Sequence, residues 1–317
     1  METFKAKRFL ICLGAIALFL TSCTNTGNPG GEPVNPPEPP KPTAEEAIGD
    51  PQYFIPDDDE LDTSISANDT RYSAANVDQM DSYLEGKTIY WLGSSVTYGA
   101  SSNGESMADF IAARAGCTSV KEAVSGTTLS DRESNSYVHR LLNGSNFSKD
   151  TKIDAFVCQI STNDAITNRV NYWGRITDDN ELDIDAFDKN TTFGAVEYII
   201  AYVAKTWDCP IYFYSGSWFG DGNNKAQRLN SNPSGTNYGR LVDAVKQIAA
   251  KWDDYEDYNV KVIDLFNDED FNDLASDKFY SWAINDPIHP RKAGYSMWWS
   301  PYIQNFIEKD LYTLIEL

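Results

Sequence analysis

The sequence predicts an α/β fold in which a parallel sheet is covered by helices on both faces. Five short apolar runs have the length and composition of buried strands, at residues 88–92, 120–124, 155–160, 211–214 and 260–265. Patterns with helical spacing lie between or after them, at residues 107–115, 193–207, 238–252 and 293–311. Strands that alternate with helices along a chain favour a parallel sheet, because each crossover helix packs against one of its faces.

The first 22 residues have the pattern of a secretory signal peptide. A basic stretch, KAKR, precedes an apolar run at residues 9–20 that is too short for a comfortable membrane span. The sequence LTSC then resembles the processing site of bacterial lipoproteins, in which the signal is removed before a cysteine that becomes acylated. We therefore expect an exported protein, at the cell surface or in the periplasm, that contacts a membrane only through a lipidated Cys23. A plain signal peptide with a chance cysteine is the alternative.

Three further segments differ in composition. Residues 23–43 are rich in Pro and Gly and nearly free of bulky apolar side chains, which predicts an extended tether. Residues 44–84 are acidic, weakly periodic and too few for a second domain, so we expect a lead-in segment that packs along the main globular domain. Residues 85–317 contain all the predicted strands and form that domain.

The charge and the cysteine and histidine content exclude several classes of protein. A formal net charge of -21 repels nucleic acid and anionic lipid headgroups, so neither is expected as a partner. Only two histidines are present, far apart and without a Cys/His cluster, so we expect no metal site and no cofactor. Buried free thiols are the preferred interpretation of Cys117, Cys158 and Cys209, although one disulfide is compatible with export.

The first predicted strand ends in GSSVTYG, which contains the best candidate for a nucleophile. A serine at the end of a central strand, before a helix begins, lies at the edge of the sheet where ligands bind, with backbone N–H groups beside it. Ser95 occupies that position. The GxSxG elbow of α/β-hydrolases fits poorly because Thr97 replaces the second glycine, and a phosphate-binding loop would need GK[ST]. A plain turn is the alternative.

The last loop offers a base and an acid for this serine. Asp286 lies three residues before His289 in INDPIHPRKAG. A serine hydroxyl needs a base to remove its proton, and the imidazole needs a carboxylate to orient it. The alternative is that Asp286 caps the final helix and His289 lies on the surface. His139 has no adjacent carboxylate and is expected to be a structural or surface residue.

Two intermediate strands are followed by candidate oxyanion donors. Gly126 lies just past the second strand in EAVSGTT, and Asn163 lies just past the third in CQISTND. A glycine N–H and an asparagine side chain can together stabilise the oxyanion of acyl transfer. Both residue types are also ordinary in loops.

In their order along the chain, these four blocks resemble those of the SGNH hydrolases, also called GDSL esterases. The resemblance covers residues 85–317. The resemblance implies that Ser95 is the nucleophile and that Asp286 and His289 complete the triad. It also implies that the N–H of Ser95, with Gly126 and Asn163, forms the oxyanion hole. The implied fold is a flavodoxin-like three-layer α/β/α sandwich with a five-stranded parallel sheet.

The chain departs from the family pattern at two positions outside the triad. Ser94 replaces the aspartate of GDS, and Ser161 replaces the glycine of the GxND block. These departures weaken the relation to the lipases and thioesterases of the family.

The leading functional hypothesis is a serine esterase that hydrolyses O-acyl esters of carbohydrates, with O-acetyl as the expected acyl group, or of small molecules. Trp173 and Trp218, with their neighbours Tyr172 and Phe219, could stack on sugar rings or could be core residues. A catalytically silent glycan-binding lipoprotein and an acetyl transferase on the same fold are the alternatives.

Overall fold

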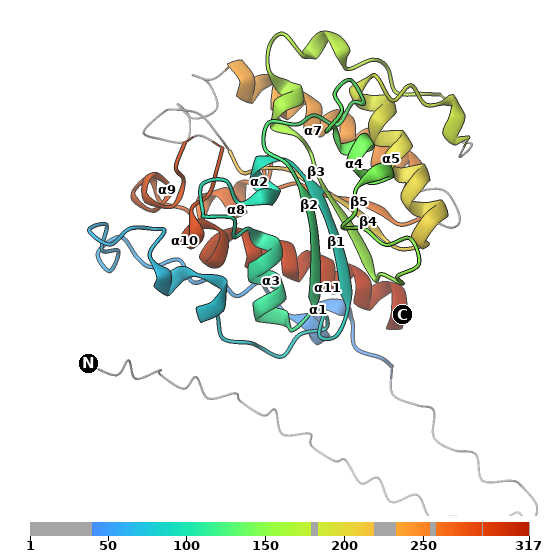
Figure 1. Cartoon of the computed structure of the whole chain (residues 1–317). Coiled ribbons are helices and arrows are strands. Elements are labelled where there is room, and N and C mark those ends of the chain that lie inside the picture. Colours follow the sequence, from blue (N-terminus) through green and yellow to red (C-terminus); the bar gives the residue numbers. More distant parts are fainter. Residues whose placement is uncertain (1–39, 179–182, 219–232, 254–257, 287, 317) are drawn as a thin grey trace, which may run out of the picture. The chain divides into compact units, whose positions relative to one another are not determined.

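The computed structural model describes residues 40–178, 183–218, 233–253, 258–286 and 288–316. Its centre is a sheet of five strands in the order β2-β1-β3-β4-β5, with every neighbouring pair parallel (Figure 1). The strands are β1 (Thr88–Gly93), β2 (Thr118–Ala123), β3 (Ala155–Gln159), β4 (Ile211–Tyr214) and β5 (Val260–Ile263). The predicted signal peptide, Cys23 and most of the predicted tether lie outside the described residues.

One face of the sheet packs against three helices. These are α4 (Tyr137–Asn143), α5 (Thr192–Trp207) and α7 (Pro233–Asp253), on the same side of the sheet in Figure 1. Tyr90, Phe156 and Phe213 project from the strands into this layer and are fully or almost fully buried. Because side chains alternate along a strand, the residues next to these three on each strand face the opposite layer.

The opposite face packs mainly against α3 (Met107–Ala115) and α11 (Ser300–Glu316). Trp91, Val157 and Tyr214 project from the strands into this second core. The chain enters α11 through α10 (Lys292–Gly294) and a π-helical turn, η6 (Tyr295–Trp299). Two short helices, α8 (Glu269–Asp273) and α9 (Asp277–Ala283), contribute Phe271 and Phe279 to the same core. Helices on both faces of a five-stranded parallel sheet confirm the predicted fold class.

The acidic lead-in segment lies along the second core. It contains α1 (Ala44–Ile48) and two 3-10 turns, η1 (Thr70–Tyr72) and η2 (Ala74–Asn76). The side chain of Asn68 donates to Ser101 O over 2.8 Å and accepts from Lys292 N over 3.0 Å. Lys292 also pairs with Glu105 at 2.8 Å. The lead-in segment therefore ties the loop after β1 to the start of the C-terminal helices.

Several boundaries differ from the sequence expectations. β2 begins at Thr118 because that residue pairs with Thr88, at the start of β1. The predicted helix at residues 293–311 is divided into α10, η6 and α11. Neither α4 nor the four-residue helix α2 (Ser95–Tyr98) was predicted. Both contribute to the candidate site described below.

Two further observations concern disulfide formation and the capacity of the helices to span a membrane. Cys117 and Cys158 are buried, Cys209 is partly buried, and all three are free thiols, so the disulfide alternative is wrong for them. Within the described ranges, no helix is both long enough and apolar enough to span a membrane.

Candidate active site

The turn after β1 places Ser95 at the start of α2. A Cβ on Gly93 would lie 1.7 Å from Thr97 Oγ1, so only glycine fits at the end of the strand. Gln159, buried at the end of β3, accepts hydrogen bonds through Oε1 from Ser94 N (2.9 Å), Thr97 N (3.2 Å) and Thr97 Oγ1 (2.9 Å). Thr97, where an α/β-hydrolase elbow has its second glycine, thus anchors the turn to the neighbouring strand.

Ser95 is the first residue of α2, so its N–H has no acceptor within the helix. The residue is 8% exposed, and its Oγ lies 2.7 Å from His289 Nε2. A hydroxyl and a backbone N–H of the same residue therefore lie at the carboxyl edge of the sheet, with an imidazole in contact with the hydroxyl.

Asp286 and His289 lie on one tight loop. The other ring nitrogen of His289, Nδ1, lies 2.9 Å from Asp286 Oδ1 and 2.8 Å from Oδ2. The backbone N–H groups of Ile288 and His289 also donate to Asp286 Oδ1, over 2.8 Å and 2.9 Å. The structure therefore brings the three residues of the predicted triad into one chain of hydrogen bonds.

The surroundings of Asp286 keep its carboxylate ionised. Partial burial by itself raises the pKa of this group, but the hydrogen bonds from the His289 ring and from the two amides outweigh burial and lower the pKa to about 2. The negative charge is therefore present at neutral pH and faces the imidazole nitrogen that must carry a proton.

The candidate oxyanion donors lie on two loops that are joined by hydrogen bonds. Gly126 follows β2 with a φ of 81°, a left-handed conformation that favours glycine. Asn163 lies in η3 (Thr162–Ala165) after β3, and its Nδ2 donates to Thr127 O over 3.0 Å. Ser161 Oγ donates to the same oxygen over 3.2 Å and accepts from Asn163 N over 3.2 Å. The serine that replaces the family glycine thus holds the asparagine loop against the glycine loop.

Sequence reasoning missed two residues that support these loops. Arg140, buried on α4, donates to Gly93 O (2.8 Å), Glu122 O (2.8 Å) and Thr127 Oγ1 (3.1 Å). It therefore joins the ends of β1 and β2 to the candidate oxyanion loop. Nothing in the stretch SYVHR marks this role.

Asp164 is the second such residue. Its carboxylate accepts from Leu129 N (2.9 Å) and Thr192 Oγ1 (2.8 Å), and burial raises its pKa. Its position beside Asn163 in STND was the only available signal. The two hydrogen bonds fasten η3 to the loop after β2 and to the start of α5.

The four aromatic candidates for substrate binding differ in exposure. Trp173 is 8% exposed, its Nε1 donates to Asp164 O over 2.8 Å, and its ring packs against Phe193. It is therefore a core residue, which corrects its prediction as a ring that stacks on substrate. Trp218 is partly buried; its backbone N–H donates to Asn272 Oδ1, and its carbonyl oxygen accepts from Tyr280 OH. Phe219 lies outside the described residues.

Tyr172, the fourth aromatic candidate, is 41% exposed. The guanidinium of Arg132 lies 3.7 Å from the centre of its ring. Of the described aromatic candidates, Tyr172 presents the most surface to solvent.

His139 takes no part in the triad contacts. It lies partly buried on α4, where its backbone N–H donates to Ser136 Oγ over 3.0 Å. In the part of the chain that the structure describes, no group of three or more His, Cys, Asp or Glu side chains is arranged to hold a metal ion.

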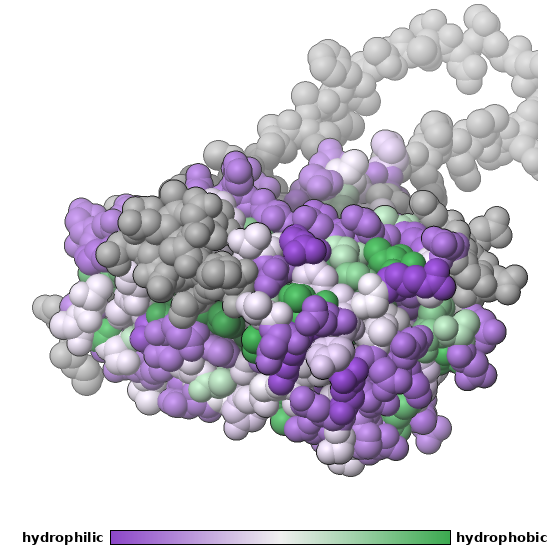
Figure 2. Space-filling view, turned by 90° about the horizontal axis from the view of Figure 1, so that it is seen from above, coloured by the Kyte–Doolittle hydropathy of each residue, from purple (hydrophilic) through white to green (hydrophobic). Residues whose placement is uncertain are grey.

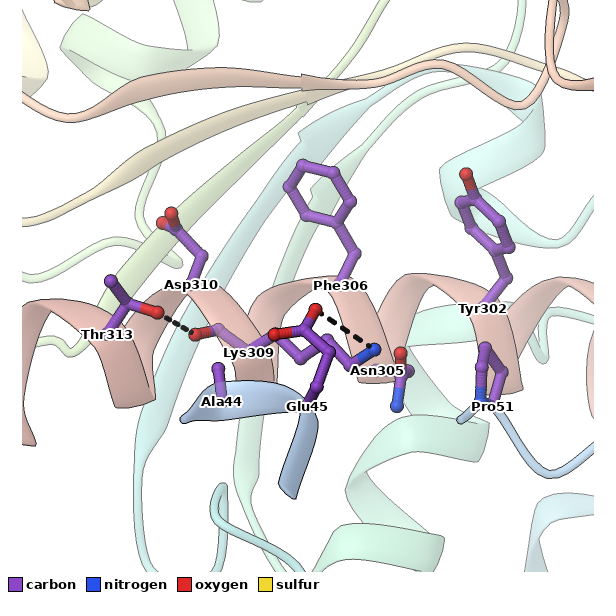
Figure 3. A pocket seen from close by; sticks show the side chains of 9 residues that line it. All are labelled: Ala44, Glu45, Pro51, Tyr302, Asn305, Phe306, Lys309, Asp310 and Thr313. Carbon is purple, nitrogen blue, oxygen red and sulfur yellow. Dashed lines mark hydrogen bonds and ion pairs between the residues drawn. The ribbon is translucent and has the colours of Figure 1, made fainter. Parts of the chain in front are cut away.

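A cavity of about 460 Å³ lies between α1 and α11, away from these residues (Figure 3). Tyr302 and Phe306 project from the same side of α11 in Figure 3, and Lys309 pairs with Glu45 of α1 at 3.6 Å. Asp310, which also lines the cavity, accepts from Tyr212 OH near the start of β4. The cavity is therefore near the amino ends of the strands, and Ser95 follows a carboxyl end.

The side of the molecule that carries α2 presents both hydrophobic and hydrophilic residues to solvent. Figure 2 shows small hydrophobic areas interspersed among hydrophilic residues on this side. Tyr98, Val124, Ile166 and Tyr172 are exposed on the segments that follow β1, β2 and β3. These side chains come from separate segments rather than from one long apolar segment.

Comparison with known proteins agrees with the four sequence blocks. The family model for GDSL-like lipases and acylhydrolases matches residues 81–300, which confirms the resemblance. No curated protein is similar enough in sequence to match the chain.

The solved structures that are similar to this chain have low sequence identity to it. A protein from Lactobacillus plantarum is 20% identical with a TM-score of 0.53, covering 70% of this chain and 97% of that one. An acetyl-xylooligosaccharide esterase variant from Geobacillus is 14% identical with a TM-score of 0.46, covering 73% and 96%. A carbohydrate acetylesterase family member from Sinorhizobium meliloti is 13% identical with a TM-score of 0.44, covering 73% and 100%.

Proposed function

Because the chain belongs to the GDSL-like lipase/acylhydrolase family and is a serine ester hydrolase, we propose that Ser95, His289 and Asp286 are its catalytic triad. The observation that carries the proposal is the continuous hydrogen-bond chain from Ser95 Oγ through both ring nitrogens of His289 to the Asp286 carboxylate. The carboxylate at Nδ1 favours a proton on that nitrogen, so Nε2 accepts the proton of the serine hydroxyl.

The reaction then follows from these positions. Ser95 Oγ attacks the ester carbonyl carbon as its proton passes to His289 Nε2. The imidazolium returns that proton to the leaving alcohol when the C–O bond breaks, which leaves an acyl group on the serine. Water attacks the acyl-enzyme, again losing a proton to His289, and the released serine recovers that proton. Asp286 stays ionised throughout and stabilises the imidazolium.

The oxyanion that forms in both steps needs hydrogen-bond donors, which we assign to the N–H groups of Ser95 and Gly126 and the side chain of Asn163. One hydrogen of the Asn163 amide is used by Thr127 O, and a primary amide carries a second. The bonds through Ser161 hold this amide before substrate arrives. Preorganised donors stabilise charge in the transition state without the cost of reorientation.

We propose that the substrates are short O-acyl esters, with O-acetyl expected, on carbohydrates. A long acyl chain needs a continuous apolar surface, whereas among the described residues the exposed apolar side chains that follow β1, β2 and β3 are dispersed over three segments. A net charge of -21 also disfavours approach to anionic lipids. Tyr172 offers an exposed ring of the kind that stacks on sugars.

A substrate panel tests this proposal. The fragment 44–317 is offered 4-nitrophenyl acetate, butyrate and octanoate, together with partially acetylated tetrasaccharides of xylose, glucose and mannose. We expect acetate to be cleaved faster than octanoate, and acetyl groups to be released from at least one tetrasaccharide. A preference for octanoate, or release that persists in Ser95→Ala, would contradict the proposal.

We propose that the reaction needs no cofactor. We further propose that the mature protein is anchored to a membrane through acylated Cys23. The support is the LTSC sequence after a basic and apolar leader. Cys23→Ala is expected to move the protein out of the membrane fraction without changing its fold, whereas Cys12→Ala, within the leader, leaves it there. Membrane retention of Cys23→Ala would refute the anchor.

A further inference from the structure

A small cavity of about 80 Å³ lies beside the candidate oxyanion donors and has no part in the triad. Thr128, two residues after Gly126, forms one wall, and Asp164, next to Asn163, forms another. Because consecutive Cα atoms are about 3.8 Å apart, the Cα of Thr128 lies within about 8 Å of that of Gly126, and the Cα of Asp164 within about 4 Å of that of Asn163. The cavity therefore adjoins the two loops that carry the candidate oxyanion donors.

Arg169 supplies an unused donor to this cavity. Its Nη1 is buried and has no hydrogen-bond partner among the described residues, while Nη2 faces the Glu133 carboxylate at 3.5 Å. Both Arg169 and Glu133 line the cavity. A buried donor without a partner is unfavourable, and an oxygen atom of a ligand would satisfy it.

Tyr172 and Arg132 also line the cavity, and Tyr172 is exposed to solvent. The guanidinium of Arg132 lies over the Tyr172 ring, which holds the ring in place while much of the side chain stays exposed. Aromatic rings bind the C–H faces of sugars, and the polar tip of a tyrosine tolerates water. An aromatic surface thus adjoins a polar recess.

The lining favours hydroxyl groups over an anion. The two arginines are balanced by the carboxylates of Glu133 and Asp164, so donors and acceptors are present together. A hydroxyl group donates and accepts, and fits such a lining, whereas a carboxylate or sulfate only accepts. A volume of about 80 Å³ corresponds to two or three waters at about 30 Å³ each, which suits one edge of a sugar ring.

We propose that this cavity is a sugar subsite: it binds the hydroxyl edge of a sugar unit of the acylated glycan, with Arg169 as hydrogen-bond donor and Tyr172 as the stacking surface. The inference rests on the proposed carbohydrate esterase activity and names the residues that select its substrate. A contact of this kind is made equally in the ground state and the transition state, so its loss raises KM and leaves kcat nearly unchanged.

Two variants test the subsite against two kinds of substrate. Arg169→Ala and Tyr172→Ala are expected to lower kcat/KM about tenfold or more, mainly through KM, on the acetylated tetrasaccharide that the wild type cleaves fastest. Hydrolysis of 4-nitrophenyl acetate, which carries no sugar, should change less than about twofold. Tyr172→Phe, which keeps the ring, should resemble the wild type, and Arg71→Ala, an arginine of the lead-in segment paired with Asp69, is the matched control.

A loss of equal size on both substrates, or no loss on either, would overturn the subsite. A binding experiment separates this failure from failure of the esterase proposal: saturation-transfer NMR with unmodified tetrasaccharides and Ser95→Ala, with and without Tyr172→Ala. Contact that disappears with the tyrosine supports the subsite even if the wild type deacetylates no sugar. Deacetylation by the wild type without any effect of the variants refutes only the subsite.

Discussion

The nucleophile turn, residues 93–99, and the acid–base loop, residues 284–291, meet at the hydrogen bond between Ser95 and His289 but are held by different contacts. The turn is fastened by residues far away in sequence: Gln159 accepts three hydrogen bonds from it, and Tyr295 OH donates to Val96 O over 2.7 Å.

The acid–base loop is fastened mainly by its own atoms. Asp286, whose side chain is 41% exposed, accepts from the amides of Ile288 and His289. Asn285 N donates to His289 O over 2.9 Å, and Arg291 N donates to Ala283 O, the residue just before the loop, over 2.7 Å.

The difference has a physical consequence. A substitution outside the acid–base loop leaves most of its hydrogen bonds intact, because they run between residues close together in the sequence. The nucleophile turn, in contrast, depends on side chains from β3 and from the C-terminal helices. The position of the nucleophile is therefore set by tertiary packing, and the orientation of the imidazole is set largely by local backbone geometry.

The largest loss of kcat is expected when either partner of the hydrogen bond between Ser95 and His289 is removed. Ser95→Ala and His289→Ala should each lower kcat roughly 10⁴-fold or more on 4-nitrophenyl acetate, and the double variant should be no worse, because the two residues act as one unit. Steady-state kinetics of the three variants measure this. Wild-type rates in Ser95→Ala would rule out the triad.

A smaller loss is expected from Asn163, the proposed oxyanion donor, which belongs to neither region. Asn163→Ala should lower kcat by about 10²-fold to 10³-fold with little change in KM, because the hydrogen bond matters chiefly once the oxyanion forms. Asn143→Ala, on α4, is the matched control. A change in KM alone would show that Asn163 binds substrate instead.

Gln159→Leu tests whether the nucleophile turn depends on its distant partner. The substitution leaves the buried N–H groups of Ser94 and Thr97 without their acceptor, which costs about 1–3 kcal/mol of stability for each unpaired donor. Displacement of Ser95 should lower kcat by up to about 10²-fold. Thermal unfolding and kinetics are measured together. An unchanged kcat in a destabilised variant would mean that the turn keeps its geometry without Gln159.

The pH dependence of stability tests the acid–base loop by itself. The pKa of Asp286 is lowered to about 2, against about 3.9 in an unfolded chain, so its carboxylate stabilises the folded state above about pH 4. That contribution is lost as the pH falls through about 2. The difference in Tm between the wild type and Asp286→Asn should therefore be largest near neutral pH and shrink between about pH 4 and pH 2. A difference that grows on acidification would contradict the lowered pKa.

The smallest effect is expected from the other histidine. His139→Ala should change kcat less than about twofold, since the residue lies on α4 and makes none of the triad contacts. Its kinetics, measured beside those of His289→Ala, separate a catalytic histidine from a structural one. An equal loss of kcat in the two variants would contradict the assignment of His289 as the base.

Much of the proposed site could be assembled from the sequence because its signals are short. Ser95 follows an apolar strand directly, and Asp286 and His289 are three residues apart, so each lies inside one readable motif. Parallel strands bring the residues after their carboxyl ends to a common edge, which is why Gly126 and Asn163 could be grouped with Ser95 from the sequence. The alternation of strands and helices was enough to predict the fold class.

The sequence by itself therefore determined the order of the elements and the residue types at the ends of the strands, since both depend on local patterns. Only the tertiary structure decided which side chains support those residues and which are exposed. Gln159 and Arg140 act across strands and helices far apart in the chain, and no local spacing marks them. Trp173 and Tyr172 are neighbours in sequence, yet one is buried in the core and the other faces solvent. Burial depends on the packing of distant segments around a residue, and a single sequence does not display that packing.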